Sequence, residues 1–407
     1  MRDGRTSTTL GQIVQINPES TDGYPPDRVV RYVDLSSISA GAGIAYGKVA
    51  VHPFGEAPGR ARRVVREGDV LVATVRPYLR GFALIPSDLD GAVASTGFAV
   101  LRSTEATLPG FVWALVGQDQ FVHHLMERAT GSNYPAVRPH DVASFPVDLP
   151  PLAVQRRIVD LVEAVSRCHE WALALASQAE IALTIAREAL IVTADSTRAP
   201  AGLVIERIES GSSPITEGRP PQVGERAVVK LSAVRAGRFQ PDETKALMAD
   251  TFMPEDALIR DGDVIITRSN TLSTVGQVCR VQVVRPKTYL SDLTLRIRLD
   301  ERRVDPDFFV EAMLTKDMRS QIEGSARGTS GSMRKISREL IRQYLLALPD
   351  LNTQRQVIVL LQSLRDVADA ATAQADALNR LRTSTLPDLL SGVHLIPEAY
   401  DALLEAV

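Results

Sequence analysis

Two short segments carry the residue types that enzymes use to cut or methylate nucleic acid. Pro241-Asp242-Glu243-Thr244-Lys245 resembles fragments of the nuclease pattern Pro-Asp…Glu-x-Lys. That chemistry needs the aspartate on a different strand from the glutamate and lysine, so that all three surround one metal ion. Tyr24-Pro25-Pro26-Asp27 has the letters of an amino-methyltransferase motif in the wrong order. Neither segment therefore predicts an active site.

The other motifs that would indicate catalysis are also missing from the sequence. There is no Gly-x-x-x-x-Gly-Lys-Ser/Thr loop for ATP, no His-Glu-x-x-His or Cys-x-x-Cys for a metal, and no glycine-rich loop after a strand for S-adenosylmethionine. We therefore expect a chain that is not an enzyme, has no metal site and binds no cofactor itself. An enzyme with an unrecognised site is the alternative.

Composition indicates an ordinary soluble globular protein of 407 residues, with 44% hydrophobic and 23% charged residues. No run of 18 apolar residues predicts a membrane span. The first residues, Met1 to Arg5, lead into polar residues instead of the apolar core of a signal peptide. Two cysteines, Cys168 and Cys279, are too few for a disulfide framework or a zinc site. We expect a cytoplasmic protein.

The net charge of −3 is unevenly distributed along the chain. Residues 1–149 carry −1 and residues 150–196 carry −2, whereas residues 197–348 carry +4 and residues 349–407 carry −4. The acidic excess thus lies in the two segments that are predicted below to be long helices. The overall sign of the charge does not exclude nucleic acid as a partner.

The chain contains an internal repeat, because four anchors recur in the same order at offsets of 196, 194, 197 and 199. The last anchor also includes Gln155-Arg156 and its second copy Gln354-Arg355. Each anchor and its second copy are Tyr32–Ile38 and Val228–Val234, Glu67–Leu71 and Asp261–Ile265, Pro109–Phe111 and Pro306–Phe308, and Leu149–Leu152 and Leu348–Leu351.

Both copies share one order of predicted elements. Short apolar runs such as 70–73 and 264–267 predict strands. A helix is expected near 109–128 and again near 306–323, followed by a Gly/Ser loop at 130–133 and at 328–332. Each copy then closes with a long helical stretch.

The closing stretches carry apolar residues at alternating steps of four and three, a heptad pattern typical of a helix that packs along another helix. Half-way along the first stretch, His169 falls in this pattern and is interpreted as a packed or register-setting residue. The two stretches are expected to pair antiparallel, although two unrelated amphipathic helices are the alternative. The expected seam residues are Ile158, Val162, Val165, Ala172, Ala176, Ala179, Leu183, Ala186 and Leu190 in the first stretch, and Val357, Leu361, Leu364, Ala368, Ala371, Ala375 and Leu378 in the second.

These features predict an α+β fold made of two tandem globular domains, each followed by a long helix. The first globular domain is expected over residues 1–149 and its helical spacer over 150–196. The second is expected over 197–348, with a C-terminal helical spacer and tail over 349–407.

The layout resembles the specificity subunit of type I restriction–modification systems, the HsdS family. The motif Leu-Pro-x-Leu-x-x-Gln-Arg begins both closing helices, and Leu386-Pro387-Asp388-Leu389-Leu390-Ser391-Gly392 with Ile396-Pro397 is similar to the ending common in that family. The resemblance covers essentially the whole chain. The closing motifs carry most of it, whereas the globular halves resemble the family in layout only.

The resemblance implies that each globular domain is a target-recognition domain that reads one half of a two-part DNA site. The paired helices would fix the gap between the half-sites and dock two methyltransferase subunits, and restriction subunits could join them. S-adenosylmethionine, ATP and Mg²⁺ would belong to those partner subunits. The system would modify DNA and defend the cell against phage.

Arginine suits DNA recognition, because its guanidinium pairs with guanine or clamps a phosphate. Clusters of basic and polar residues at equivalent places in both halves are therefore the candidate DNA contacts. In the first half they are Arg60, Arg62, Arg63, Arg76, Tyr78, Arg80, Ser132, Asn133, Tyr134 and Arg138. In the second half they are Lys230, Arg235, Arg238, Arg268, Ser269, Asn270, Arg327, Ser330, Ser332, Arg334 and Lys335.

A protein–protein scaffold that does not bind DNA is the alternative from another class, and the near-neutral charge of the domains favours it. The halves differ most between their anchors, as in Arg76-Pro77-Tyr78-Leu79-Arg80 against Arg268-Ser269-Asn270-Thr271-Leu272. We therefore predict that they read different half-sites.

Overall fold

The computed structural model describes residues 4–39, 43–192, 198–328, 333–397 and 399–400, which form two compact units. Unit 1 comprises Met1–Leu173 and Ala373–Val407, and unit 2 comprises Ala174–Thr372. Each unit thus contains one globular half together with parts of both long helices. The boundaries predicted for the globular domains remain a prediction. Over the described ranges, no helix is both long and apolar enough to cross a membrane.

Unit 1 contains two four-stranded sheets, of order β6-β3-β10-β7 and β2-β11-β8-β9, and the two-stranded pairs β1-β12 and β4-β5. All pairs in the two larger sheets are antiparallel except β3 with β10, in which Val93 lies opposite Tyr32. The strands are β1 (Thr6–Thr9), β2 (Val14–Ile16), β3 (Val29–Val33), β4 (Ile38–Ser39), β5 (Gly43–Ile44), β6 (Ala50–Pro53), β7 (Ala61–Val64), β8 (Val70–Ala73), β9 (Phe82–Leu84), β10 (Val93–Ser95), β11 (Phe98–Ser103) and β12 (Pro146–Leu149).

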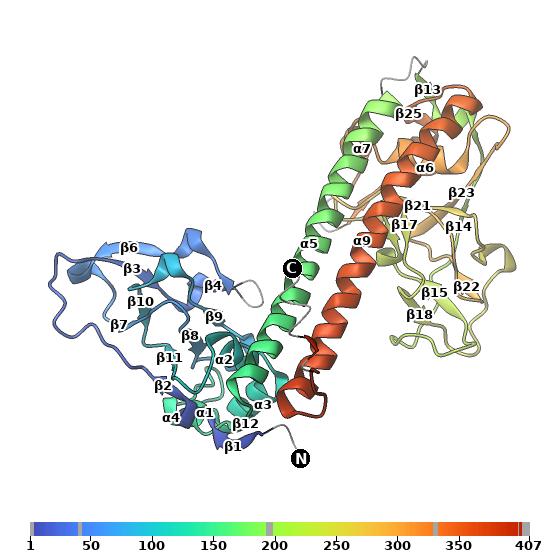
Figure 1. Ribbon diagram of the computed structural model, residues 1–407. Coiled ribbons are helices and arrows are strands. Elements are labelled where there is room, and N and C mark those ends of the chain that lie inside the picture. Colours follow the sequence, from blue (N-terminus) through green and yellow to red (C-terminus); the bar gives the residue numbers. More distant parts are fainter. Residues whose placement is uncertain (1–3, 40–42, 193–197, 329–332, 398, 401–407) are drawn as a thin grey trace. The chain divides into compact units, whose positions relative to one another are not determined.

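Unit 2 follows an equivalent order, with sheets β14-β23-β19-β21 and β18-β15-β22 and the pairs β13-β25, β16-β17 and β20-β24. Figure 1 shows β14, β21 and β23 gathered in this unit. Its one parallel pair among these sheets, β15 with β22, is the counterpart of β3 with β10. The strands are β13 (Arg198–Pro200), β14 (Ile205–Ser210), β15 (Ala227–Val229), β16 (Val234–Arg235), β17 (Arg238–Phe239), β18 (Thr244–Ala246), β19 (Val264–Thr267), β20 (Ser269–Asn270), β21 (Val278–Arg280), β22 (Thr288–Tyr289), β23 (Thr294–Leu299), β24 (Arg334–Lys335) and β25 (Leu345–Ala347).

The strands predicted at 70–73 and 264–267 are confirmed as β8 and β19, and every residue of both is buried. The anchor before each strand is a tight turn, in which Gly68 and Gly262 have positive φ angles of 80° and 87°. The aspartate that follows, Asp69 or Asp263, accepts the backbone N–H three residues earlier in the chain. This anchor of the repeat is therefore structural.

The single helices predicted near 109–128 and 306–323 are wrong, because each is two helices. They are α2 (Pro109–Val116) with α3 (Asp119–Arg128), and α6 (Pro306–Met313) with α7 (Lys316–Ser325). In the second copy, the Thr315 hydroxyl accepts the Met318 N–H and begins a new helix. The short helices α1 (Leu10–Ile13), α4 (Pro139–Ala143) and α8 (Arg338–Gln343) complete the units.

The glutamines of the closing motif fasten the start of each long helix to the segment just before α2 or α6. The buried Gln155 accepts the Leu108 N–H at 3.0 Å, and its amide donates to the carbonyls of Ala106 and Pro150. Gln354 makes the same three kinds of bond, with Asp305 N–H, Arg303 O and Pro349 O. The repeated glutamine therefore satisfies backbone groups where the chain enters the long helix.

The long helices are α5 (Leu152–Arg187) and α9 (Leu351–Ser391), and α9 continues through Pro387. A π-helical turn, Glu188–Val192, follows α5. Among the predicted seam residues, Val162, Val165, Ala186, Leu190, Leu364 and Leu378, like His169, are half-buried. The remaining seam residues are buried: Ile158, Ala172, Ala176, Ala179, Leu183, Val357, Leu361, Ala368, Ala371 and Ala375.

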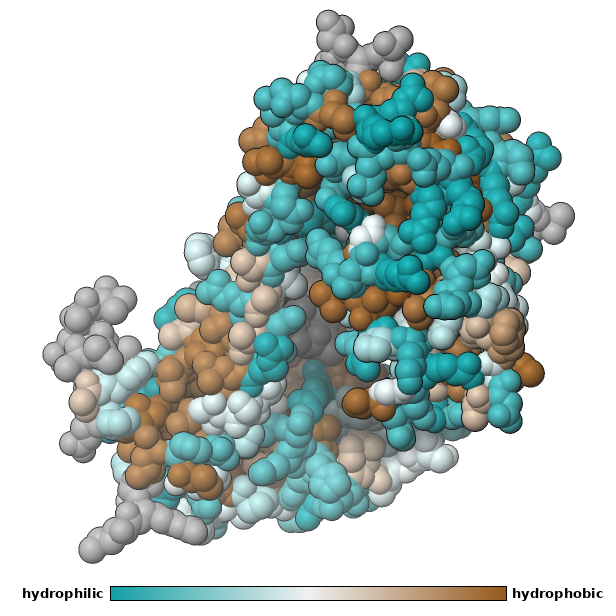
Figure 2. All heavy atoms as spheres, turned by 90° about the vertical axis from the view of Figure 1, so that its right-hand side faces the viewer, coloured by the Kyte–Doolittle hydropathy of each residue, from teal (hydrophilic) through white to brown (hydrophobic). Residues whose placement is uncertain are grey.

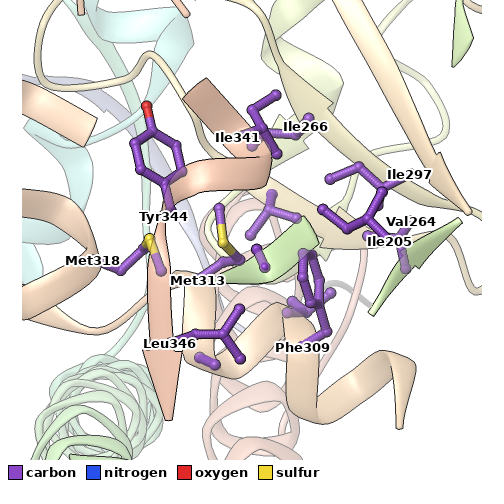
Figure 3. Close-up of a cluster of buried hydrophobic side chains, with 14 of the residues drawn as sticks. Ile205, Val264, Ile266, Ile297, Phe309, Met313, Met318, Ile341, Tyr344 and Leu346 are labelled. Atoms are coloured by element: carbon purple, nitrogen blue, oxygen red, sulfur yellow. The ribbon is translucent and has the colours of Figure 1, made fainter. Parts of the chain in front are cut away.

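The core of unit 2 lies between its larger sheet and the helix α6. Figure 3 shows Ile205, Val264 and Ile297 of the sheet facing Phe309 of α6, with Met313 beside them. Parts of both long helices complete this core, since Leu183 of α5 and Leu361 of α9 belong to it. In unit 1, Ile158 of α5 and Leu389 of α9 join the core in the same way.

Candidate nucleic-acid interface

In unit 1, two of the three candidate clusters come together. The segment after β8 pairs with the Gly/Ser loop through the bridge between Val75 and Ala136, and the Arg76 N–H donates to Pro135 O at 2.7 Å. The loop is closed on itself by two hydrogen bonds between Thr130 and Ala136. The guanidinium of Arg76 then lies over the ring of Tyr134, 4.3 Å from its centre.

Unit 2 repeats this arrangement. The short strand β20 after β19 pairs with β24, so that Ser269 lies opposite Lys335 and Asn270 opposite Arg334. Two hydrogen bonds between Arg327 and Lys335 close the loop, as the Thr130–Ala136 bonds do in unit 1. The predicted contacts Ser330 and Ser332 lie outside the described residues. Equivalent backbone bonds thus place different side chains in the two loops.

A cavity of about 1050 Å³ opens in unit 2, and Asn270 of β20 is among the residues that line it. It lies between the strand β15 of the smaller sheet and the residues that follow β19 of the larger one. Three predicted contacts, Lys230, Arg235 and Asn270, line it. Its other polar and charged lining residues are Ser213, Thr216, Ser232, Lys245, Thr271, Thr274, Gln277, Ser291 and Asp292.

The charged groups of the cavity are mostly cationic, with Lys230, Arg235 and Lys245 against Asp292. Lys230 lies 3.5 Å from Glu243, whose carboxylate also accepts the Ser232 hydroxyl at 2.6 Å. The hydroxyl bond, and then the charge of Lys230, lower the pKa of Glu243. Figure 2, which views the molecule from the right-hand side of Figure 1, shows a largely hydrophilic surface with hydrophobic patches between. A concave, cationic and hydrogen-bonding surface suits a nucleic-acid backbone and base edges.

Several predicted contacts are engaged elsewhere in the protein. Arg80 pairs with Asp119 at the start of α3. Arg238 lies between Glu180 of α5 and Asp369 of α9, at 2.6 Å from each, and so holds the long helices to the globular part of unit 2. Ser269 is buried, and its hydroxyl faces the sulfur of Met333. We therefore assign these three residues structural roles.

The remaining predicted contacts are not among the residues that line the cavity of unit 2. Arg60, Arg62 and Arg63 form a cluster at and just before β7, in which Arg60 and Arg62 are exposed. The loop residues Tyr78, Ser132, Asn133 and Tyr134 are exposed, as are Arg138, Arg268, Arg327 and Lys335, whereas Arg334 is half-buried.

Sequence reasoning missed Lys245 and Gln277 as candidate contacts. Lys245 belongs to the nuclease-like segment, where only its catalytic use was considered, and the pairing of β18 with β15 brings it beside Val228 of the cavity. The other residues of that segment are engaged, Asp242 with Arg285 and Glu243 with Lys230. The register of β18 against β15 could not be read from the sequence.

Comparison with known proteins gives relatives of one kind. No family model matches the chain. Over 169 residues, it is 27% identical to the specificity subunit of the type I restriction enzyme EcoEI of Escherichia coli. That match covers 41% of this chain and 28% of the relative, so the chain spans little more than a quarter of the relative's length.

Two solved structures share the fold over nearly the whole chain. One is the S subunit of a type I restriction–modification system from M. genitalium, with 12% identity, a TM-score of 0.59, and coverage of 95% of this chain and 96% of that one. The other comes from a study of complex assembly and conformational transition of the type I R-M system, with 24% identity, a TM-score of 0.60, and coverage of 95% and 97%. The predicted α+β fold and the resemblance to these specificity subunits are confirmed.

Proposed function

We propose that this relative of type I restriction–modification specificity subunits is itself a sequence-specific DNA-binding subunit, in which each globular half reads one part of a two-part site. The observation that carries the proposal is the cavity of unit 2, whose lining combines the cations Lys230, Arg235 and Lys245 with polar and apolar side chains. The amides of Asn270 and Gln277, which also line it, are groups that read base edges, whereas the cations suit phosphates.

The paired long helices are proposed to set the gap between the two half-sites. In unit 2, Leu183 near the end of α5 shares a core with Val357 and Leu361 near the start of α9. In unit 1, Ile158 near the start of α5 shares a core with Leu389 near the end of α9. Both observations support antiparallel pairing, in which a rigid helical spacer makes the gap a fixed length.

The outer faces of the same helices are proposed to dock two methyltransferase subunits. Large apolar side chains are exposed there, among them Trp171 and Ile185 of α5 and Val359 and Leu360 of α9. Exposed apolar side chains along these helices are available for contact with another protein. The methyltransferase partners would then methylate the DNA, with S-adenosylmethionine bound to them. Restriction subunits, which would use ATP and Mg²⁺, could join the complex. The complex would work in the cytoplasm in defence against phage.

The methylation map of a plasmid tests this proposal. The host would express the chain with its neighbouring methyltransferase, and a matched host would lack only this chain. We expect methylation at one gapped, two-part motif that disappears when the chain is omitted. An active methyltransferase whose methylation does not depend on this chain would contradict the proposal.

A protein–protein scaffold is the second candidate, and the net charge of −3 favours it. DNA affinity separates the two functions. A specificity subunit in its methyltransferase complex should lose affinity steeply as salt rises, because phosphate contacts release counterions. A scaffold would bind no DNA at any salt concentration.

A further inference from the structure

Arg76 of unit 1 has a guanidinium held in place by stacking instead of by an ion pair. It lies 4.3 Å from the ring centre of Tyr134. Its Nε atom is buried without a hydrogen-bond partner in the part of the chain that the structure describes. A planar guanidinium stacks on an aromatic face and leaves its N–H groups directed away from the stack.

Other arginines nearby have their donors occupied. Both Nε and Nη2 of Arg102 bind the Asp69 carboxylate at 2.9 Å, Arg66 binds Glu19, and Arg80 binds Asp119 and the Gly117 carbonyl. These arginines stabilise the fold. Among these four arginines in the described part of the chain, Arg76 alone combines a fixed position with donors that no described carboxylate occupies.

The backbone also fixes the position of Arg76. Its φ angle is positive, at 50°, which is uncommon for a residue with a side chain. The Arg76 N–H is bound to Pro135 O, and Val137 N–H is bound to Thr74 O, so the loop that carries Tyr134 is tied to the segment that carries Arg76. Positive φ at a non-glycine residue occurs at functional sites and, as at Arg80 of this chain, at structural ones, so it fixes the position of Arg76 without by itself assigning a role.

We infer that Arg76 reads a guanine in the half-site of unit 1, and that Tyr134 is the residue that positions it. The inference rests on the proposed DNA-binding function. Arginine donates two hydrogen bonds to the O6 and N7 atoms of guanine in the major groove, and this pairing needs the guanidinium plane to be set. Stacking on Tyr134 sets that plane before DNA binds, which lowers the entropy lost on binding.

The pair formed by Arg76 and Tyr134 has no counterpart in unit 2, so its effect on the recognised sequence should be confined to one half-site. The backbone bonds of Thr74 and of Arg268 are equivalent, so Arg76 corresponds to Asn270 and Tyr134 to Met333. Unit 2 thus has neither the guanidinium nor the ring at these positions. A change at Arg76 should alter one part of the recognised motif only.

The test is the methylation motif of the full complex carrying Arg76→Gln. We expect one G·C position of one half-site to relax, with discrimination falling about 5- to 150-fold, and the other half-site and the gap to stay unchanged. Tyr134→Ser should weaken discrimination at the same position, and Tyr134→Phe, which keeps the ring, should retain it. The matched control is Arg28→Gln, since Arg28 also stacks on a tyrosine, 3.9 Å from the ring centre of Tyr24, outside these loops.

Three outcomes would overturn the inference. An unchanged motif with uniformly weaker binding and a smaller salt dependence would make Arg76 a phosphate contact. Relaxation at an A·T position would exclude guanine as the base that is read. If the wild-type complex shows no chain-dependent motif, the proposed function and the inference both fail. If the wild-type complex has such a motif and Arg76→Gln leaves it intact, only the inference fails.

Discussion

In unit 2, the buried Glu311 of α6 lies between Arg187 of α5, at 2.6 Å, and Arg365 of α9. The anchors of the repeat place Ala114 of α2 at the equivalent position in unit 1. There α2 packs on α5 by close apolar contact, since a Cβ added to Gly110 would lie 2.6 Å from a methyl carbon of Val159. Both units therefore pack apolar residues of the long helices into their cores, and unit 2 adds a buried cluster of charges.

The candidate DNA contacts also differ between the two units, in charge and in residue type. Lys230 of the unit 2 cavity corresponds to Asp34 in unit 1, and Asn270 corresponds to Arg76. The turns before β8 and β19, the order of the strands in the sheets β2-β11-β8-β9 and β14-β23-β19-β21, and the motif glutamines are equivalent in the two units. The repeat thus preserves the backbone hydrogen bonds that define the fold, while the side chains exposed on that frame diverge.

The largest expected effect is a loss of stability when the buried charges of unit 2 lose their partner. Glu311→Ala would leave Arg187 and Arg365 buried without their carboxylate, which costs about 3–5 kcal/mol. The free energy of unfolding, measured by urea denaturation, should fall by that amount. Glu323→Ala, which breaks the more exposed pair with Arg319, is the control and should cost less than about 1 kcal/mol. Equal effects of the two variants would refute the role given to Glu311.

A second prediction concerns the glutamines that the units share. Gln155→Ala and Gln354→Ala each leave a buried N–H and two carbonyls without their partner, so each should lower the free energy of unfolding by about 1–3 kcal/mol. Similar losses would support the structural equivalence of the two units. A loss in only one unit would show that the motif has different roles in the two copies.

The cavity of unit 2 gives a third prediction. Lys230→Gln with Lys245→Gln removes two cations, so the slope of log affinity against log salt should become shallower by about two. DNA titrations of the full complex at several salt concentrations measure this slope. Lys316→Gln, in α7 and away from the cavity, is the control and should leave the slope unchanged. An unchanged slope in the double variant would show that this cavity does not contact DNA phosphates.

The smallest expected effect is a difference in labelling rate between the two thiols of the chain. Burial raises the pKa of Cys279 in unit 2 to about 12, so its reactive thiolate is scarce at neutral pH, whereas Cys168 in unit 1 is exposed. A maleimide should therefore label one thiol of the native chain rapidly and the second only on unfolding. Fast labelling of both thiols would contradict the packing of unit 2.

The sequence predicted what depends on periodicity and on repeated anchors. The strands at 70–73 and 264–267 and the buried heptad residues such as Leu361 follow directly from apolar spacing. The break between α2 and α3 was missed, because the local geometry at Gly117, where α2 ends, is not visible in apolar spacing.

The candidate site could be predicted only in part. Clusters near Arg76 and in the Gly/Ser loops were named from the sequence, and their pairing in space follows from backbone bonds that no pattern predicts. Arg238 has the same residue type as Arg235 three positions earlier, yet it binds two carboxylates on the long helices. Whether an arginine is engaged depends on tertiary partners, which is why residue type alone did not separate these two.

The exchange of one globular half tests the central claim most directly. Residues 1–149 would be replaced by the corresponding segment of a specificity subunit with a different target, and the methylation motif of the chimeric complex would be mapped beside that of the wild type. Two independently reading halves predict that one part of the motif changes while the other part and the gap remain. A change in both parts would contradict the account.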